Sequence, residues 1–71
     1  MQRASDAALA ARQALAARRR AAAAIAADLE HQLDALDDPR AHERVRRRRD
    51  QQAALVAELD RMLREGDAAA E

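Results

Sequence analysis

The chain contains no cysteine and no Phe, Tyr or Trp, and it has one proline and one glycine. Without cysteine it can form neither a disulfide nor a thiolate metal site. Its two histidines, His31 and His42, are too few for a zinc cage. Ser5 is the only hydroxyl-bearing residue, and one glycine cannot build a phosphate-binding loop. We therefore expect a protein that is not an enzyme and that needs no metal and no cofactor.

The apolar residues are mostly small. They make up 49% of the 71 residues, and 22 of them are alanine. The larger ones are eight Leu, two Val, two Met and one Ile. Alanine, leucine, arginine and glutamate all favour helices, whereas β-branched residues are few. The composition therefore predicts an all-α fold whose contacts come from leucine side chains and close alanine packing.

The charges balance, because 13 arginines meet 13 acidic residues. A balanced chain has no global attraction to nucleic acid or to an anionic lipid surface. No segment reaches the ~20 consecutive apolar residues of a membrane span, and the N-terminal residues lack the apolar segment of a signal peptide. We expect a cytoplasmic protein with no membrane contact.

The segment Asp37-Asp38-Pro39 interrupts an otherwise helical sequence. Proline disfavours helical geometry in the residue before it and is well placed at the first position of a helix, which Asp38 can cap. Ser5 is a candidate cap for the first helix, and Gly66 suits a left-handed stop after the second. The sequence thus predicts a single domain with a helix over 5–37, a turn at 37–39, a helix over 39–65 and a frayed tail at 66–71.

Residues at alternating steps of three and four predict one heptad stripe on each helix. A short connection makes two such helices antiparallel neighbours, so the expected fold is a coiled-coil-like hairpin. Leu33 and Ala26 widen the first stripe, and Leu63 and Val56 widen the second. The stripes are Ala4, Ala8, Ala11, Leu15, Arg18, Ala22, Ile25, Leu29, Gln32 and Leu36 in the first helix, and Ala41, Val45, Arg48, Gln52, Leu55, Leu59 and Met62 in the second.

A hairpin of this size buries too little to offset the entropy of ordering it. We therefore expect its apolar face to be completed by another protein or by a second copy of the chain. The residues predicted to hold the hairpin and to present its edge to that partner are Ile25, Leu29, Leu33, Leu36, Val45, Leu55, Leu59, Met62 and Leu63.

Five arginines flank Val45 in the run 44–49. Arg44, Arg46, Arg47 and Arg49 are candidate nucleic-acid contacts, but at 100° per residue they spread around the helix. Glu43 with Arg47, and Arg46 with Asp50, have the spacing of helix-stabilising ion pairs. No aromatic side chain is present to stack on a base. These points favour a solvated helix surface, while Arg48 has Asp28 or Glu30 as a candidate partner across the hairpin.

The stretch 22–63, AAAAIAADLEHQLDALDDPRAHERVRRRRDQQAALVAELDRML, resembles the type III secretion needle co-chaperones, the YscE/PscE family. The resemblance implies a short cytoplasmic hairpin that binds a tetratricopeptide-like chaperone and keeps a needle subunit soluble. Two alternatives remain open. The arginine run is compatible with a Rop-like homodimeric four-helix bundle that binds RNA. The segment LEHQLDALDDPRAHERV is similar to the docking or dimerisation hairpins of modular polyketide synthases.

Overall fold

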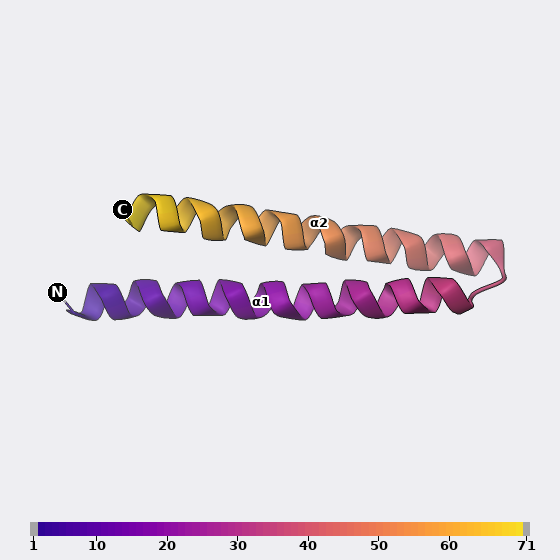
Figure 1. The fold of residues 1–71 in the computed structure, drawn as a ribbon, viewed down its shortest axis with the longest axis horizontal. Coiled ribbons are helices and arrows are strands. Elements are labelled where there is room, and N and C mark those ends of the chain that lie inside the picture. Colours follow the sequence, from indigo (N-terminus) through magenta and orange to yellow (C-terminus); the bar gives the residue numbers. More distant parts are fainter. Residues whose placement is uncertain (1, 71) are drawn as a thin grey trace.

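The computed structural model describes the backbone of residues 2–70 and the side chains of residues 6–66. It consists of α1 (Gln2–Ala35) and α2 (Pro39–Ala70), which run antiparallel, lie close together near the turn and diverge toward the termini (Figure 1). The molecule is 57 Å long and 16 by 13 Å across. The predicted all-α hairpin is confirmed. We call the end with the two termini the open end.

The predicted turn forms, but it begins earlier than expected, because α1 ends at Ala35 and not at residue 37. Residues 36–38 connect the helices, and a carboxylate oxygen of Asp38 accepts a hydrogen bond from the backbone N–H of Ala41 at 3.3 Å. The Asp38 carbonyl accepts the first bond of α2, from the N–H of His42 at 2.9 Å. Pro39 is the first helical residue, where its missing N–H leaves no bond unmade. Asp38 and Pro39 together therefore fix where the chain reverses.

The outer helix ends differ from the prediction. α1 begins at Gln2, so Ser5 lies inside the helix, and its side chain is outside the described residues. α2 continues through Gly66 to Ala70, and the described chain contains no glycine with positive φ. Alanines follow Gly66 and favour helix, and no turn is required there. The predicted frayed tail is therefore wrong for residues 66–70, and Glu71 lies outside the described chain.

The contact between the helices is a single stripe, here called the seam. Its most buried members in the described part of the chain are Ala22, Leu29 and Leu59, each 3% exposed. The others are half-buried, so the hairpin has a shallow core. The seam comprises Leu15, Arg19, Ala22, Ala26, Leu29, Leu33 and Leu36 of α1, and Val45, Arg49, Gln52, Val56, Leu59 and Leu63 of α2.

The seam departs from the predicted stripes at every second position. The prediction placed Gln32, Leu55 and Met62 inward, whereas the structure turns Leu33, Val56 and Leu63 inward. The same shift replaces Arg18, Ile25 and Arg48 by Arg19, Ala26 and Arg49. Removing Gln32 from the contact avoids burying an amide, and each arginine that enters the seam meets an acid of the other helix. Both sets of inward-facing residues follow the heptad spacing, so residue types alone do not decide between them.

Candidate functional site

Two faces of the hairpin flank the seam, one on each side. Antiparallel helices are related by a two-fold axis perpendicular to the hairpin, so equivalent heptad positions of both helices lie on the same face. Glu30, Arg46 and Asp60 share one heptad position and lie on one face. Ile25, Leu55 and Met62 share the position on the other side of the seam and lie on the other face. The chemistry of the two faces differs.

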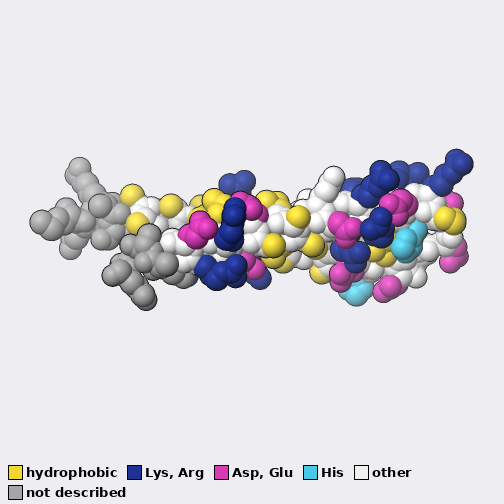
Figure 2. All heavy atoms as spheres, turned by 90° about the horizontal axis from the view of Figure 1, so that it is seen from above, with side chains coloured by type: hydrophobic (Ala, Val, Ile, Leu, Met, Phe, Trp, Pro, Cys, Tyr) yellow, Lys and Arg dark blue, Asp and Glu magenta, His cyan; other side chains and the backbone are white. Residues whose placement is uncertain are grey.

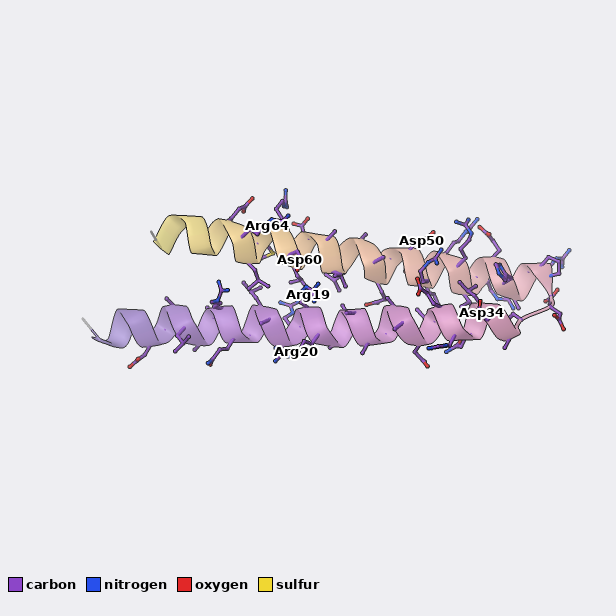
Figure 3. The ribbon with its side chains drawn as sticks, viewed as in Figure 1. Arg19, Arg20, Asp34, Asp50, Asp60 and Arg64 are labelled. Atoms are coloured by element: carbon purple, nitrogen blue, oxygen red, sulfur yellow. The ribbon has the colours of Figure 1, made fainter. Side chains whose placement is uncertain are left out.

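On the face that carries Glu30, Arg46 and Asp60, an ion pair joins the two helices. The Arg19 guanidinium donates two hydrogen bonds to the Asp60 carboxylate, through Nε to one oxygen and through Nη2 to the other at 3.3 Å. Figure 3 shows the two side chains turned toward one another between α1 and α2. The hydrogen bonds and charge of Arg19, with a contribution from Arg64, lower the pKa of Asp60. The same carboxylate raises the pKa of Arg19.

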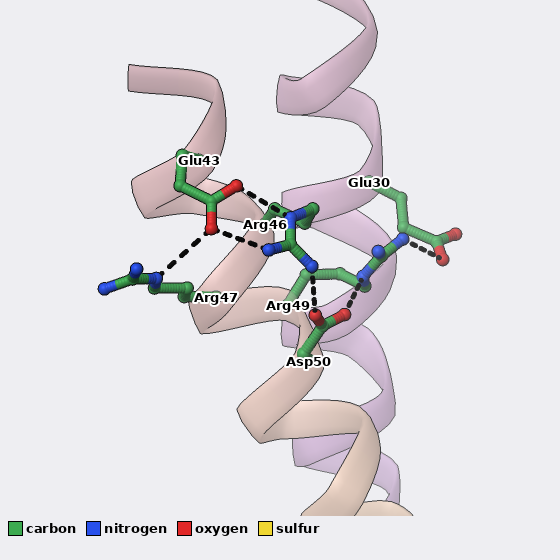
Figure 4. A network of polar contacts seen from close by, with 6 residues as sticks. All are labelled: Glu30, Glu43, Arg46, Arg47, Arg49 and Asp50. Carbon is green, nitrogen blue, oxygen red and sulfur yellow. Dashed lines mark hydrogen bonds and ion pairs between the residues drawn. The ribbon is translucent and has the colours of Figure 1, made fainter. Parts of the chain in front are cut away.

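A second cross-helix pair joins Arg49 to Glu30, with Nη1 and Oε1 3.5 Å apart. Arg49 also donates from Nε to Asp50 at 2.8 Å, and Asp50 accepts from Arg46 at 3.1 Å. Arg46 in turn makes two hydrogen bonds to Glu43, at 2.6 and 2.9 Å (Figure 4). We call the surface formed by Arg19, Asp60, Glu30, Arg49 and Arg46 the ion-paired face.

Glu43 is the anchor of this network at the start of α2. It accepts from Arg46 and, at 3.2 Å, from Nε of Arg47. These hydrogen bonds, chiefly that of Arg46, and the two positive charges lower the pKa of Glu43 from 4.5 to about 2. The carboxylate therefore stays charged at any ordinary pH.

The network accounts for most of the arginine run. The predicted pairs Glu43–Arg47 and Arg46–Asp50 are both present. Of the four candidate nucleic-acid contacts, Arg46, Arg47 and Arg49 are held by carboxylates and Arg44 is exposed. The predicted cross-hairpin partner of Arg48 is wrong: Glu30 pairs with Arg49, while Asp28 accepts a hydrogen bond from Gln32 at 3.1 Å.

The second face is apolar. Ile25 is 46% exposed, and Leu55 and Met62 are each 40% exposed. They share their heptad position with Arg18, Gln32 and Arg48. We call this surface the apolar face and define it by Ile25, Leu55 and Met62. In the view from the side of α2, charged side chains gather in two groups, one near the turn and one toward the open end, with largely uncharged surface between them (Figure 2).

An apolar groove lies at the open end. It has a volume of about 380 Å³ and is lined chiefly by apolar side chains. Leu9, 54% exposed, is the most exposed of the large apolar residues in the described chain. Leu15 and Met62, one from each helix, lie in the same groove. The full lining is Ala8, Leu9, Ala11, Arg12, Leu15, Met62, Leu63 and Gly66.

The structure divides the predicted partner-binding residues into two sets. Leu29 and Leu59 are buried in the seam, and Leu33, Leu36, Val45 and Leu63 are half-buried there. Ile25, Leu55 and Met62 lie outside it on the apolar face. The first set holds the helices together, and only the second is available to another surface.

His31 is exposed and His42 is half-buried near the turn. No group of three or more His, Asp or Glu side chains in the described residues is arranged to hold a metal ion. Neither helix, over its described length, has a stretch that is long and apolar enough to cross a membrane.

Neither the Arg19–Asp60 pair nor the position of Leu9 in the groove was predicted from the sequence. A signal for the first was present, because Arg19 and Asp60 lie at nearly equal distances before and after Pro39, as Glu30 and Arg49 also do. Opposite charges at matched distances from a turn indicate pairs across a hairpin. For Leu9, the groove depends on both helices, so its own position gave no signal.

Comparison with known proteins adds no assignment: no family model matches the chain, and neither a curated protein nor a solved structure is significantly similar to it.

Proposed function

We propose that this chain is a non-enzymatic protein-interaction module, which binds a second helical surface through its apolar face and the adjoining groove. The observation that carries the proposal is the division of its large apolar side chains. Within the described residues the seam buries Leu29 and Leu59 to 3% exposure, while Ile25, Leu55 and Met62 stay 40–46% exposed. The free energy gained by burying apolar surface favours covering these side chains.

A specific form of this function is that of a small cytoplasmic co-chaperone. The resemblance of residues 22–63 to the type III secretion needle co-chaperones supports it, as does the hairpin architecture. Such a protein would hold a tetratricopeptide-like chaperone or a needle subunit against the exposed residues Ile25, Leu55 and Met62. The docking function in a multienzyme assembly would use the same surface.

Binding of RNA by the arginine run is less well supported by the geometry. Arg46, Arg47 and Arg49 already form ion pairs with acids of their own chain. A phosphate would have to compete with Glu43 and Asp50 for them, and those carboxylates dilute the local positive potential.

In-cell photo-crosslinking tests the proposed function. A benzoylphenylalanine at Met62 should form a covalent adduct with a protein, because this position lies on the apolar face and in the groove. The matched control is the same amino acid at Ala54, which is exposed. Ala54 lies on the side of α2 opposite to the seam residues Gln52 and Val56, and so faces away from α1.

We expect adducts at Met62 and few at Ala54. Mass spectrometry of the adduct identifies the partner and separates the co-chaperone and docking functions. Equal labelling at both positions, or no protein adduct at Met62, would contradict the proposed function.

A further inference from the structure

Resting on the proposed function, we infer that the partner of the apolar face is a second copy of this chain. The two hairpins stack face to face, with each helix antiparallel to the helix it packs on. Three observations carry the inference: the exposed area, an uncharged belt around Ile25 and Leu55, and the order of charges along each helix.

The chain exposes more surface than its mass requires. Its accessible area is 5692 Å². A compact protein of 7.8 kDa exposes about 4,400 Å² by the usual scaling of area with mass, about 1,300 Å² less. A stable interface of standard size removes about 800 Å² from each partner. The hairpin therefore has enough surplus surface to form a dimer.

The surface available for such contact is an uncharged belt at the middle of the hairpin. Residues 21–27 of α1 and 51–57 of α2 contain no charged side chain. The two cross-helix pairs, Arg19–Asp60 and Glu30–Arg49, bracket both segments, so the belt lies at one level of the molecule. Its two large exposed side chains, Ile25 and Leu55, both lie on the apolar face. Stacking two copies there joins four such side chains in one apolar layer.

Charges on either side of the belt select the partner. In α1 the residues before the belt carry five arginines and one acid, whereas residues 28–38 carry five acids and no arginine. In the second half of the chain, residues 39–50 carry six arginines and two acids, and residues 58–71 carry five acids and two arginines. Each helix thus changes from basic to acidic along its length.

A second copy matches this order of charges. Two hairpins that stack about a two-fold axis with their helices aligned place every helix on an antiparallel neighbour. This holds whether the two turns lie at the same end or at opposite ends. Each basic segment then lies along an acidic segment of the other copy, and the neutral chain as a whole does not repel itself.

Sedimentation equilibrium of the full chain tests the inference. Between about 10 µM and about 1 mM, the measured mass should rise from 7.8 kDa toward twice that value. Leu55→Glu should raise the dissociation constant at least about tenfold, because it places a charge in the centre of the interface. Ile25→Gln, a milder change at the same layer, should weaken association without threatening the fold, and circular dichroism checks the helicity of both variants.

Ala54→Glu is the matched control. It introduces the same charge in the residue before Leu55, but Ala54 is exposed on the side of α2 that is turned away from α1. The dissociation constant of this variant should stay within about twofold of that of the parent chain. A mass of 7.8 kDa at every concentration would overturn the inference, and so would equal weakening by Ala54→Glu and Leu55→Glu.

The crosslinking experiment keeps this result separate from the proposed function. Adducts at Met62 with a different protein, together with a monomer in the centrifuge, would overturn the second copy and retain the interaction module. The absence of any protein adduct at Met62 would contradict both. Adducts between two copies of the chain support both.

Discussion

The ion-paired face and the apolar face flank the same seam and are built by the same two helices. They differ in how their side chains interact. On the first, Arg19 and Asp60 and then Glu30 and Arg49 join the helices through charge. On the second, Ile25 of α1 and Leu55 of α2 remain 46% and 40% exposed. The first face is held by ion pairs within the single hairpin, whereas the second leaves large apolar side chains exposed.

The difference shows how a chain without aromatic residues divides its few large apolar side chains. The seam takes Leu29 and Leu59, and alanines allow the helices to approach closely between them. Ion pairs hold one side of that contact and need no apolar surface. Ile25, Leu55 and Met62 therefore remain for a second contact.

The largest effect is expected from Leu29→Asp, which removes the seam on which both faces depend. Leu29 is 3% exposed, and losing a buried leucine costs about 2–5 kcal/mol even without adding a charge. A chain of this length has little stability in reserve. The variant should lose its helical circular dichroism at 25 °C. If the variant kept both its helicity and its partner binding, the claim that Leu29 holds the two helices together would be contradicted.

A smaller effect separates the seam from the apolar face. Leu59→Ala should lower the free energy of unfolding by about 2–5 kcal/mol, because Leu59 is buried. Leu55→Ala makes the same chemical change at 40% exposure and should cost much less when measured at low protein concentration. Urea titration of the two variants gives the comparison. Equal losses would show that Leu55 belongs to the core.

The ion-paired face should be sensitive to acid. The pKa values of Asp60 and Glu43 are lowered in the folded chain, so these carboxylates stabilise it above their ordinary pKa values. That contribution is lost as the pH falls from about 4.5 toward about 2, where Glu43 protonates. The thermal midpoint should decrease over this range. In the double variant Asp60→Asn with Glu43→Gln, the thermal midpoint should decrease less over the same pH range. Identical pH profiles for the variant and the parent chain would contradict the claim that these two carboxylates stabilise the fold.

The smallest effect is expected from Arg46→Glu combined with Arg47→Glu. Both side chains are exposed and their pairs lie within α2, so the hairpin should remain folded and its protein binding should change little. RNA retention by a filter assay should be equally weak in both proteins. A large loss of RNA binding in the variant would place the function in the arginine run instead of on the apolar face.

The fold could be predicted from the sequence because its signals are local. Asp38 and Pro39 mark the reversal, and the three-and-four spacing of leucines marks two helices. The outer helix ends were harder to predict, because a glycine such as Gly66 permits a helix to stop but does not require it. The alanines after Gly66 continue the helix.

The phase of the seam could not be fixed by the same means. Leu55 and Val56, like Met62 and Leu63, are adjacent apolar residues, and either member of each pair completes a heptad. The choice depends on what crosses the contact. Arg19 and Arg49 enter the seam because Asp60 and Glu30 receive them, and this information lies on the opposite helix. The exposed surface followed from that choice.

The most direct test of the account is the solvent accessibility of the Ile25 side chain. Ile25 is the only isoleucine, so its labelled methyl group gives one resonance, and the two valines, both in the seam, serve as references. A soluble paramagnetic agent should broaden the Ile25 signal in dilute solution and lose this effect as the protein concentration rises, while the valine signals change little. An Ile25 methyl group that stays equally accessible at every concentration and in the presence of cell extract would contradict the claim that another protein surface covers the apolar face.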